Sequence, residues 1–201
     1  PHAAHFDPRK FHFIGSPSTE VEVMVVRHGA QVKTIEDALT KPLIVGASSP
    51  GSATLDFPLA INAILGTKFK IVAGYKGATE VKLAMQRGEV EANVALAWGS
   101  AKTQYADLLK SKQLLVVAQF AHKHPDLPDV PLWPEAKTEE GRQIMSILYA
   151  RGDYGRPFAT PPDVPADRIK ALRAAFDATM KDPGFLAAAK KVKLDILPLS
   201  G

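Results

Sequence analysis

The sequence predicts an α/β protein built on a mainly parallel sheet, and two observations support this fold class. Short apolar runs, rich in β-branched residues, alternate with amphipathic stretches of helical period along most of the 201 residues. Such an alternation implies a sheet with helices on both faces. Hydrophobic residues make up 46% of the chain and charged residues 23%, a composition that supplies a core and excludes a disordered protein.

The first strand is expected at residues 21–26, a run rich in valine. A short helix follows, in which Thr34 is the N-cap and Asp37, three residues on, makes an imperfect capping box. Residues 43–47 predict a second strand that is apolar on both faces. A turn of small residues then leads into a helix that includes residues 61–65.

Glycines end the next two helices, because glycine adopts the left-handed conformation that closes a helix. Gly66 ends the first of them, and a strand at residues 69–72 follows. The second helix is expected at residues 78–87 and ends at Gly88. The next strand is expected at residues 90–96, which continues the alternation of strand and helix.

A helix at residues 100–109 and a strand at residues 114–118 complete this alternation. Residues 122–134 contain four prolines, so this segment is expected to be neither a helix nor a central strand. The remaining elements are a helix at 138–150, a strand at 156–160, a helix that starts at Pro165, a helix restarted at Asp182-Pro183, and a last strand at 194–197.

Charge and composition exclude several classes of function. The net charge of +4 is scattered along the chain and aromatic residues make up only 7%, so we expect no nucleic-acid partner. The chain has no cysteine, which excludes disulfides, thiolate metal sites and iron–sulfur clusters. No apolar run reaches the roughly 18 residues of a membrane span. The chain begins at Pro1, without an initiator methionine or a signal peptide, so we expect a processed protein or a piece of a longer one.

The turn after the strand at residues 43–47 is the most informative segment. Its small residues let a ligand reach the backbone, and the N–H groups at a helix start favour an anion. The hydroxyls of Ser49, Ser52 and Thr54 add donors. A P-loop is excluded because Ser52 stands where the motif requires lysine, and a nucleophile elbow is excluded because Pro50 replaces its glycine. An anion site and an ordinary tight turn both remain open on these residues.

Two further segments are expected on the same edge of the predicted sheet. Tyr75, Lys76 and Gly77 join a strand to a helix, where Lys76 would attract an anion and Gly77 would expose the next helix start. A solvated lysine in a loop is the alternative. Trp98 closes the following strand, either as a wall of a cleft or as part of the core.

Neither catalytic nor metal chemistry is indicated. The pairs His2/His5 and His122/His124 have no third ligand at a defined spacing, so we expect no metal and no cofactor. No Ser/His/Asp arrangement and no paired carboxylates stand out.

A series of short motifs occurs in a characteristic order along the chain. They are Phe6-Asp7-Pro8, the turn at residues 46–54, Tyr75-Lys76-Gly77, Gly88-Glu89-Val90-Glu91, Leu127-Pro128-Asp129-Val130-Pro131, Phe158-Ala159-Thr160-Pro161, Val164-Pro165-Ala166 and Lys181-Asp182-Pro183. Together they resemble the receptors of tripartite tricarboxylate transporters, the TctC or Bug solute-binding proteins. The resemblance covers nearly the whole chain, and its specificity lies in the order and spacing of the motifs.

The resemblance implies a type II periplasmic-binding-protein fold, with two α/β lobes around a ligand cleft. Family members bind small carboxylates, or related organic acids and amides, and deliver them to membrane transporter subunits, so the resemblance implies a periplasmic receptor and not an enzyme. In the family, a ligand carboxylate is held by a turn that corresponds here to Ser49, Gly51, Ser52, Ala53 and Thr54. The family's Gly-rich turn of the first lobe is absent from this chain, so that lobe is expected to be incomplete.

Three departures from the family pattern bear on the ligand. Ala95 stands where the family often has an aspartate, which removes a hydrogen bond to the ligand or changes the specificity. Asp56 places a carboxylate in the first helical turn, where it would repel an anion. Pro58 cannot donate a backbone hydrogen bond, so the helix start is expected to shift. These features leave room for a less charged ligand.

The resemblance assigns residues 21–117 to the second lobe, and residues 1–20 with 118–201 to the remainder of the first. Two alternatives stay open: an α/β enzyme that acts on a phosphorylated or carboxylated small molecule at the same turn, and a truncated assembly module that binds nothing. An incomplete lobe exposes sheet edge and core surface, so we also expect pairing into a homodimer or a swapped assembly.

Overall fold

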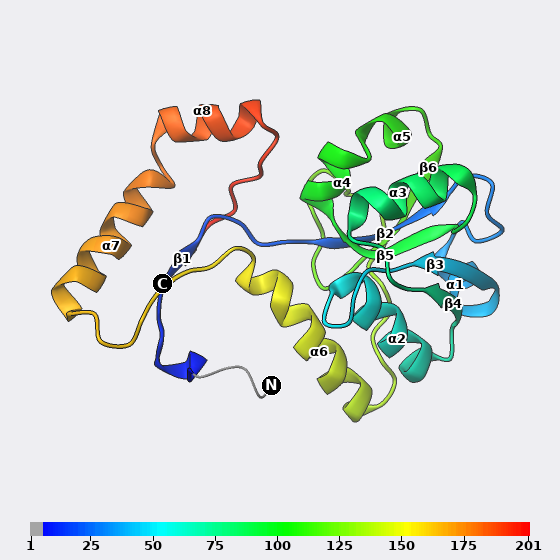
Figure 1. Ribbon diagram of the computed structural model, residues 1–201, viewed down its shortest axis with the longest axis horizontal. Coiled ribbons are helices and arrows are strands. Elements are labelled where there is room, and N and C mark those ends of the chain that lie inside the picture. Colours follow the sequence, from blue (N-terminus) through cyan, green and yellow to red (C-terminus); the bar gives the residue numbers. More distant parts are fainter. Residues whose placement is uncertain (1–5) are drawn as a thin grey trace. The chain divides into compact units, whose positions relative to one another are not determined.

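The computed structural model describes residues 6–201, and the chain divides into two compact units (Figure 1). Unit 1 is formed by Pro1–Thr19 and Asp153–Gly201, and unit 2 by Glu20–Gly152. The α/β class predicted from the sequence is confirmed, since helices pack against a sheet in both units. Among the described residues, no helix has the length and apolar character needed to cross a membrane.

Unit 2 is built on a five-stranded sheet in the order β4-β3-β5-β2-β6. Strand β3 pairs in parallel with β4 and β5, whereas β2 pairs antiparallel with β5 and β6. Four strands therefore run in one direction and β2 runs against them. The strands are β2 (Glu22–Arg27), β3 (Pro42–Gly46), β4 (Lys68–Val72), β5 (Ala92–Ala97) and β6 (Leu114–Gln119).

Helices cover both faces of this sheet, as the alternation of patterns predicts. One apolar cluster joins the sheet to α1, α2 and α6, and a second joins it to α3, α4 and α5. The first is centred on Phe57 and Phe120, whose rings lie 5.3 Å apart, and the second on the buried Tyr105. The helices are α1 (Ile35–Thr40), α2 (Ala53–Leu65), α3 (Ala78–Arg87), α4 (Trp98–Gln104), α5 (Ala106–Lys110) and α6 (Glu139–Tyr154).

The helix ends of unit 2 follow the predicted signals. The Thr34 hydroxyl accepts the N–H of Asp37 at the start of α1, and Gly66 and Gly88 end α2 and α3 in the left-handed conformation. Two details differ from the prediction. Pro58 lies inside α2 without shifting its start, and the expected helix at residues 100–109 is divided at Tyr105 into α4 and α5.

The lobe boundary predicted after residue 117 is corrected by the structure, which keeps residues 118–152 in unit 2. Strand β6 continues to Gln119, and Phe120 and Trp133 beyond it are buried in the first apolar cluster. Helix α6 adds Met145 to the same cluster. The Pro-rich segment between Phe120 and Trp133 has the composition of a linker, yet the side chains at both of its ends are buried in the core.

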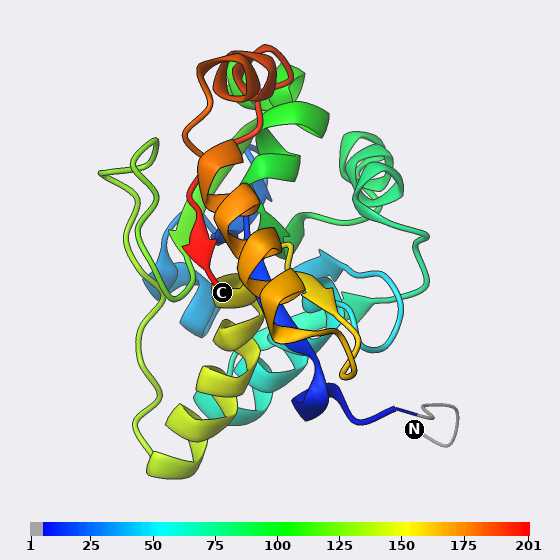
Figure 2. The same cartoon turned by 90° about the vertical axis from the view of Figure 1, so that its left-hand side faces the viewer.

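Unit 1 contains a three-stranded antiparallel sheet in the order β7-β1-β8. Helix α7 (Ala166–Thr179) lies along it (Figure 2), and Arg173 donates two hydrogen bonds, of 3.0 and 2.7 Å, to the carbonyl of Phe13. The last strand is found at Leu199–Ser200, not at residues 194–197, and the first strand was not predicted. The remaining elements are the short 3₁₀ helix η1 (Pro8–Lys10), β1 (His12–Ser16), β7 (Phe158–Thr160) and α8 (Pro183–Lys191).

Gln119 organises the Pro-rich segment of unit 2 from inside the core. Its fully buried amide donates to the carbonyls of Leu127 at 2.9 Å and Val130 at 2.7 Å. Its carbonyl accepts the N–H of His124 at 2.7 Å. One side chain therefore satisfies three backbone groups of a segment that has no regular structure of its own.

Asp126 anchors the same segment to α4. Its carboxylate accepts hydrogen bonds from Lys102 at 2.9 Å and from the indole N–H of Trp98 at 3.1 Å. The hydrogen bond from Lys102, and then that from Trp98, hold the pKa of the Asp126 carboxyl below its usual value. The Trp98 ring is buried beside the ring of His124, so this side chain serves packing.

We expect Gln119→Leu to lower the free energy of unfolding by about 3 kcal/mol, because three backbone groups lose the hydrogen bonds that the buried Gln119 side chain makes to them. Urea denaturation measures this change. Gln143→Leu is the matched control, since Gln143 is exposed and its amide makes one bond of 3.3 Å to Glu139. The control should change stability by less than about 0.5 kcal/mol. Equal changes in the two variants would contradict the anchoring role.

The lowered pKa of Asp126 predicts a pH-dependent contribution to stability. A carboxylate whose pKa is lower in the folded chain stabilises above its unfolded pKa, and this contribution is lost as the pH falls through the folded value. Asp126→Asn should therefore cost up to about 1 kcal/mol at neutral pH, since the side chain is partly exposed. The cost should begin to fall near pH 3.8, the ordinary value for this group, and should disappear once the pH is below the lower folded value. Urea denaturation of Asp126→Asn at several pH values measures this cost, and Asp129→Asn is a control in the same segment. A cost that persists at pH 2 would refute a stabilising role for the ionised Asp126 carboxylate.

Candidate ligand-binding site

The candidate site lies on the edge of unit 2 where the parallel strands β3 and β4 end. The turn after β3 leads into α2, and the loop after β4 leads into α3. Two hydrogen bonds of 3.3 Å tie these segments together, from the N–H of Gly74 to the carbonyl of Ser48 and from the N–H of Tyr75 to that of Ala47. In an open α/β sheet, this carboxyl edge is where ligands bind.

The hydroxyl of Thr54 gives the turn its shape. It accepts the N–H of Ser48 at 3.2 Å and lies 2.9 Å from the Ser48 hydroxyl and 3.3 Å from that of Ser52. Ser49 is exposed, and its hydroxyl has no partner among the described residues. Of the predicted donors, Thr54 therefore has a structural role, Ser49 is exposed, and Ser52 is half-buried with a weak contact of 3.3 Å to Thr54.

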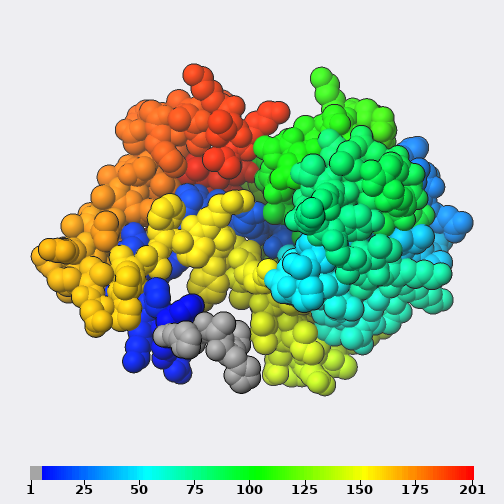
Figure 3. All heavy atoms as spheres, in the orientation of Figure 1, coloured from blue at the N-terminus to red at the C-terminus, as the bar shows by residue number. Residues whose placement is uncertain are grey.

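Two backbone N–H groups at the start of α2 have no acceptor among residues 6–201. Ser52 is the N-cap, and its own N–H donates to the carbonyl of Ser49 at 3.1 Å. Ala53 and Thr54 are the first two helical residues, whose N–H groups have no acceptor within a helix. Gly51, with φ of 83°, has open space where a side chain would stand, so the backbone is accessible there. In Figure 3, the cyan atoms of this part of the chain lie at the surface.

Asp56 and Arg151 complete the turn with a pair of opposite charges. The Asp56 carboxylate accepts the N–H of Gly51 at 3.2 Å and faces Arg151 at 3.3 Å. Arg151, from α6, also donates to the carbonyl of Gly51 at 3.1 Å. The predicted repulsion between Asp56 and an anion is therefore balanced by a nearby guanidinium. Nothing in the sequence pointed to Arg151, which lies 95 residues from Asp56 along the chain.

The segment of Tyr75, Lys76 and Gly77 lies beside this turn, as predicted. The N–H of Lys76 donates to Glu80 at 2.8 Å, which fixes the start of α3, while its ammonium is exposed and has no ion pair among the described residues. A Cβ on Gly46 would lie 3.6 Å from the ring of Tyr75. Lys76 is therefore available to an anion, and Tyr75 flanks the base of the turn.

Among the described residues, neither Trp98 nor Ala95 brings a free polar group to this edge. The indole of Trp98 is committed to Asp126 and the core. Ala95 occupies a bulge in β5 with φ of 58°, in the left-handed region, and is buried. Its methyl group offers no hydrogen bond where the resemblance places an aspartate.

The histidine pairs add no ligand set to this edge. Nδ1 of His124 accepts the N–H of Asp126 at 3.0 Å, which commits that nitrogen to the Pro-rich segment. The pair His2/His5 lies outside the described residues.

The chain is similar to known proteins in structure, whereas its sequence gives no match. No family model and no curated protein sequence matches this chain. A TctC solute-binding protein from Polaromonas matches with a TM-score of 0.72 and 18% identity, over 100% of this chain and 66% of that one. A protein of R. palustris solved with adipate matches with a TM-score of 0.63 and 18% identity, over 95% and 62%. An arginine transport system periplasmic binding protein from Legionella pneumophila matches with a TM-score of 0.53 and 15% identity, over 93% and 68%.

At these identities the likeness establishes the fold. The chain spans 66% and 62% of the length of the first two matching proteins. This likeness confirms, for the fold, the resemblance to TctC proteins that the sequence motifs indicate. The chain has part of the α/β fold of type II periplasmic binding proteins.

Proposed function

We propose that the chain is an extracytoplasmic solute-binding receptor, which holds a small organic acid at the carboxyl edge of unit 2. One observation carries the proposal: within the described part of the chain, the N–H groups of Ala53 and Thr54 have no acceptor, and they lie on the edge where this fold binds ligands. A carboxylate is the natural partner of such a pair, since it accepts two hydrogen bonds and is favoured by the helix dipole. The likeness to solute-binding proteins supports a binding role over catalysis.

The accessible groups of the turn define how an acid would be held. Its carboxylate would accept from the N–H groups of Ala53 and Thr54 and from the hydroxyls of Ser49 and Ser52. The exposed Lys76 would add long-range attraction, which is screened by salt. Thr54 would keep the turn in shape through its hydroxyl.

The balanced charges of Asp56 and Arg151 bear on the class of ligand. The R. palustris neighbour was solved with adipate, which supports organic acids as a class. At this turn, Asp56 disfavours a second negative charge close to the first, while Arg151 compensates part of that repulsion. We therefore propose a ligand that presents one carboxylate to the turn, with its other end an amide, a hydroxyl or a distant acid.

The proposal includes delivery of the ligand to membrane subunits of a tripartite tricarboxylate-type transporter, in the periplasm. Delivery to such a transporter is inferred from the motif resemblance and from the structural likeness to a TctC solute-binding protein. An α/β enzyme at the same turn is the alternative, and chemical conversion of a bound acid would favour it. An assembly module that binds no ligand is the third reading.

Pairing of two copies stays a prediction. Unit 1 leaves several large apolar side chains exposed, which is a feature of surfaces that associate. They include Phe158, Leu172, Val192 and Leu194. Light scattering of the chain over a range of concentrations measures the state of association.

Ala53→Pro tests the role of the backbone donors directly. Proline is favoured at the first position of a helix, and Ser52 before it has the extended backbone that a following proline requires (φ −89°, ψ 148°). The variant should therefore keep the unfolding temperature of the free chain while removing one donor. In a thermal-shift screen of short mono- and dicarboxylates, including adipate, we expect at least one acid to stabilise the unaltered chain. Its dissociation constant should rise about tenfold in Ala53→Pro.

Ala166→Pro is the matched control, because Ala166 is the first residue of α7 and follows the extended Pro165 (φ −55°, ψ 141°). This variant should bind the same acid as tightly as the unaltered chain. Failure of every acid to raise the unfolding temperature would refute an organic-acid receptor. Equal binding by Ala53→Pro and the unaltered chain would show that the ligand is held elsewhere.

A further inference from the structure

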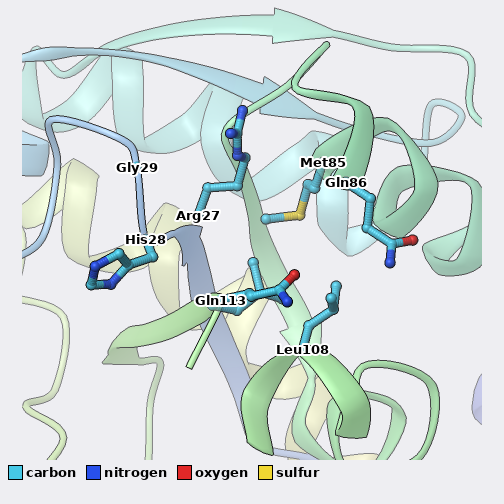
Figure 4. A pocket seen from close by; sticks show the side chains of 8 residues that line it. Arg27, His28, Gly29, Met85, Gln86, Leu108 and Gln113 are labelled. Carbon is cyan, nitrogen blue, oxygen red and sulfur yellow. The ribbon is translucent and has the colours of Figure 1, made fainter. Parts of the chain in front are cut away.

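A pocket of about 180 Å³ lies at the opposite edge of the sheet in unit 2 (Figure 4). Strand β2 ends there with Arg27, which pairs with Leu114 at the start of β6. Because β2 runs against the other strands, this edge is the amino end of β3 and β5, away from the candidate ligand turn. Just past the two strands, the N–H of His28 donates to the carbonyl of Gln113 at 2.8 Å, which closes the pocket on one side.

The floor of the pocket is apolar and belongs to the core. Met85, Leu108 and Leu114 line it, each less than 5% exposed and each part of the second apolar cluster. An apolar cavity of roughly 150 Å³ accepts a benzene molecule. The pocket therefore offers space for an organic group of about the size of one six-membered ring.

Arg27 brings an unpaired positive charge to this apolar floor. Its guanidinium lies between two glycines: a Cβ on Gly88 would lie 2.8 Å from Nη1, and one on Gly29 would lie 3.8 Å from Nη2. The side chain is half-buried, yet the guanidinium has no hydrogen bond or ion pair among residues 6–201. A guanidinium in this state has donors available for a carboxylate.

The remaining polar groups at the pocket are neutral amides. Gln86 and Gln113 line it and are exposed, and neither side chain makes a hydrogen bond within the described chain. Figure 4 shows the stem of Arg27 beside Met85, with Gln113 and Leu108 across from it, while the imidazole of His28 points away. None of the described residues that line the pocket is acidic. The lining therefore favours one negative charge attached to a compact apolar body.

We propose that this pocket is a second binding site, for a small monocarboxylate with a ring-sized apolar group. The carboxylate would take up the donors of Arg27, the apolar group would cover Met85, Leu108 and Leu114, and the amides of Gln86 and Gln113 would flank it. The proposal is independent of the receptor function, because no residue of the pocket belongs to the turn at residues 48–54.

The four methionines of the chain make a direct test available. Benzoate is titrated into the full chain carrying ¹³C-methyl methionine, and the signals are followed by NMR. Met85 lines the pocket, whereas the other three methionines do not, so they report on nonspecific effects and on folding. We expect the Met85 signal to shift to saturation while the others stay in place. Benzamide, which has the same ring without the charge, should bind about tenfold more weakly.

Arg27→Gln should weaken benzoate binding about tenfold. Arg87→Gln is the matched control, since Arg87 stands near the same end of α3 but is paired with Glu89 at 2.6 Å and does not line the pocket. This control should change binding less than about twofold, and Ala53→Pro should leave the Met85 response unchanged. Absence of a saturable Met85 shift, equal binding of benzoate and benzamide, or equal losses in the two arginine variants would each overturn the proposal. The benzoate–benzamide comparison decides even if Arg27→Gln does not fold.

Discussion

Strand β2 is the constraint on which the arrangement of unit 2 depends. It enters the sheet directly from unit 1, pairs on both sides, and buries every residue from Glu22 to Val26. Because it runs against the four other strands, it brings its own carboxyl end, Arg27, to the edge opposite the turn after β3. The two edges thus acquire different chemistry, with backbone donors at one and an arginine beside apolar side chains at the other.

The turn before α2 shows how small residues and opposite charges are combined at such an edge. Small side chains leave the backbone open, and the Thr54 hydroxyl holds the turn in one shape. Asp56 and Arg151 then neutralise each other against the same turn. A carboxylate in the first helical turn would by itself weaken an anion site, and the guanidinium from α6 offsets this effect. The chemistry at this edge therefore depends on a helix that is distant in sequence.

The local features of the fold could be predicted from the sequence because their signals are local. The cap at Thr34 and the glycine that ends α3 depend on a few neighbouring residues, and the structure confirms both. The reversed direction of β2 was not predictable, because an apolar run is the same in either direction. Strand β1 was not predicted, because its five residues show no alternation of apolar and polar side chains.

The candidate site was predictable only in part. Its position followed from a strand, a turn of small residues and a helix, which are consecutive in the chain. Its electrostatics did not, because Arg151 reaches Gly51 across 100 residues of sequence. The sequence left Trp98 as either a wall of a cleft or part of the core, since its partner Asp126 lies in a segment whose prolines give no sign of this contact.

The N–H groups of Ala53 and Thr54, at the start of α2, are proposed to receive a carboxylate. The most direct measurement follows the ¹⁵N amide signals of Ala53 and Thr54 while the acid that most raises the unfolding temperature is titrated into the full chain. These two signals should shift together and saturate, with the same dissociation constant that the thermal shift gives. Signals of Ala53 and Thr54 that stay in place while the acid binds would contradict this proposal.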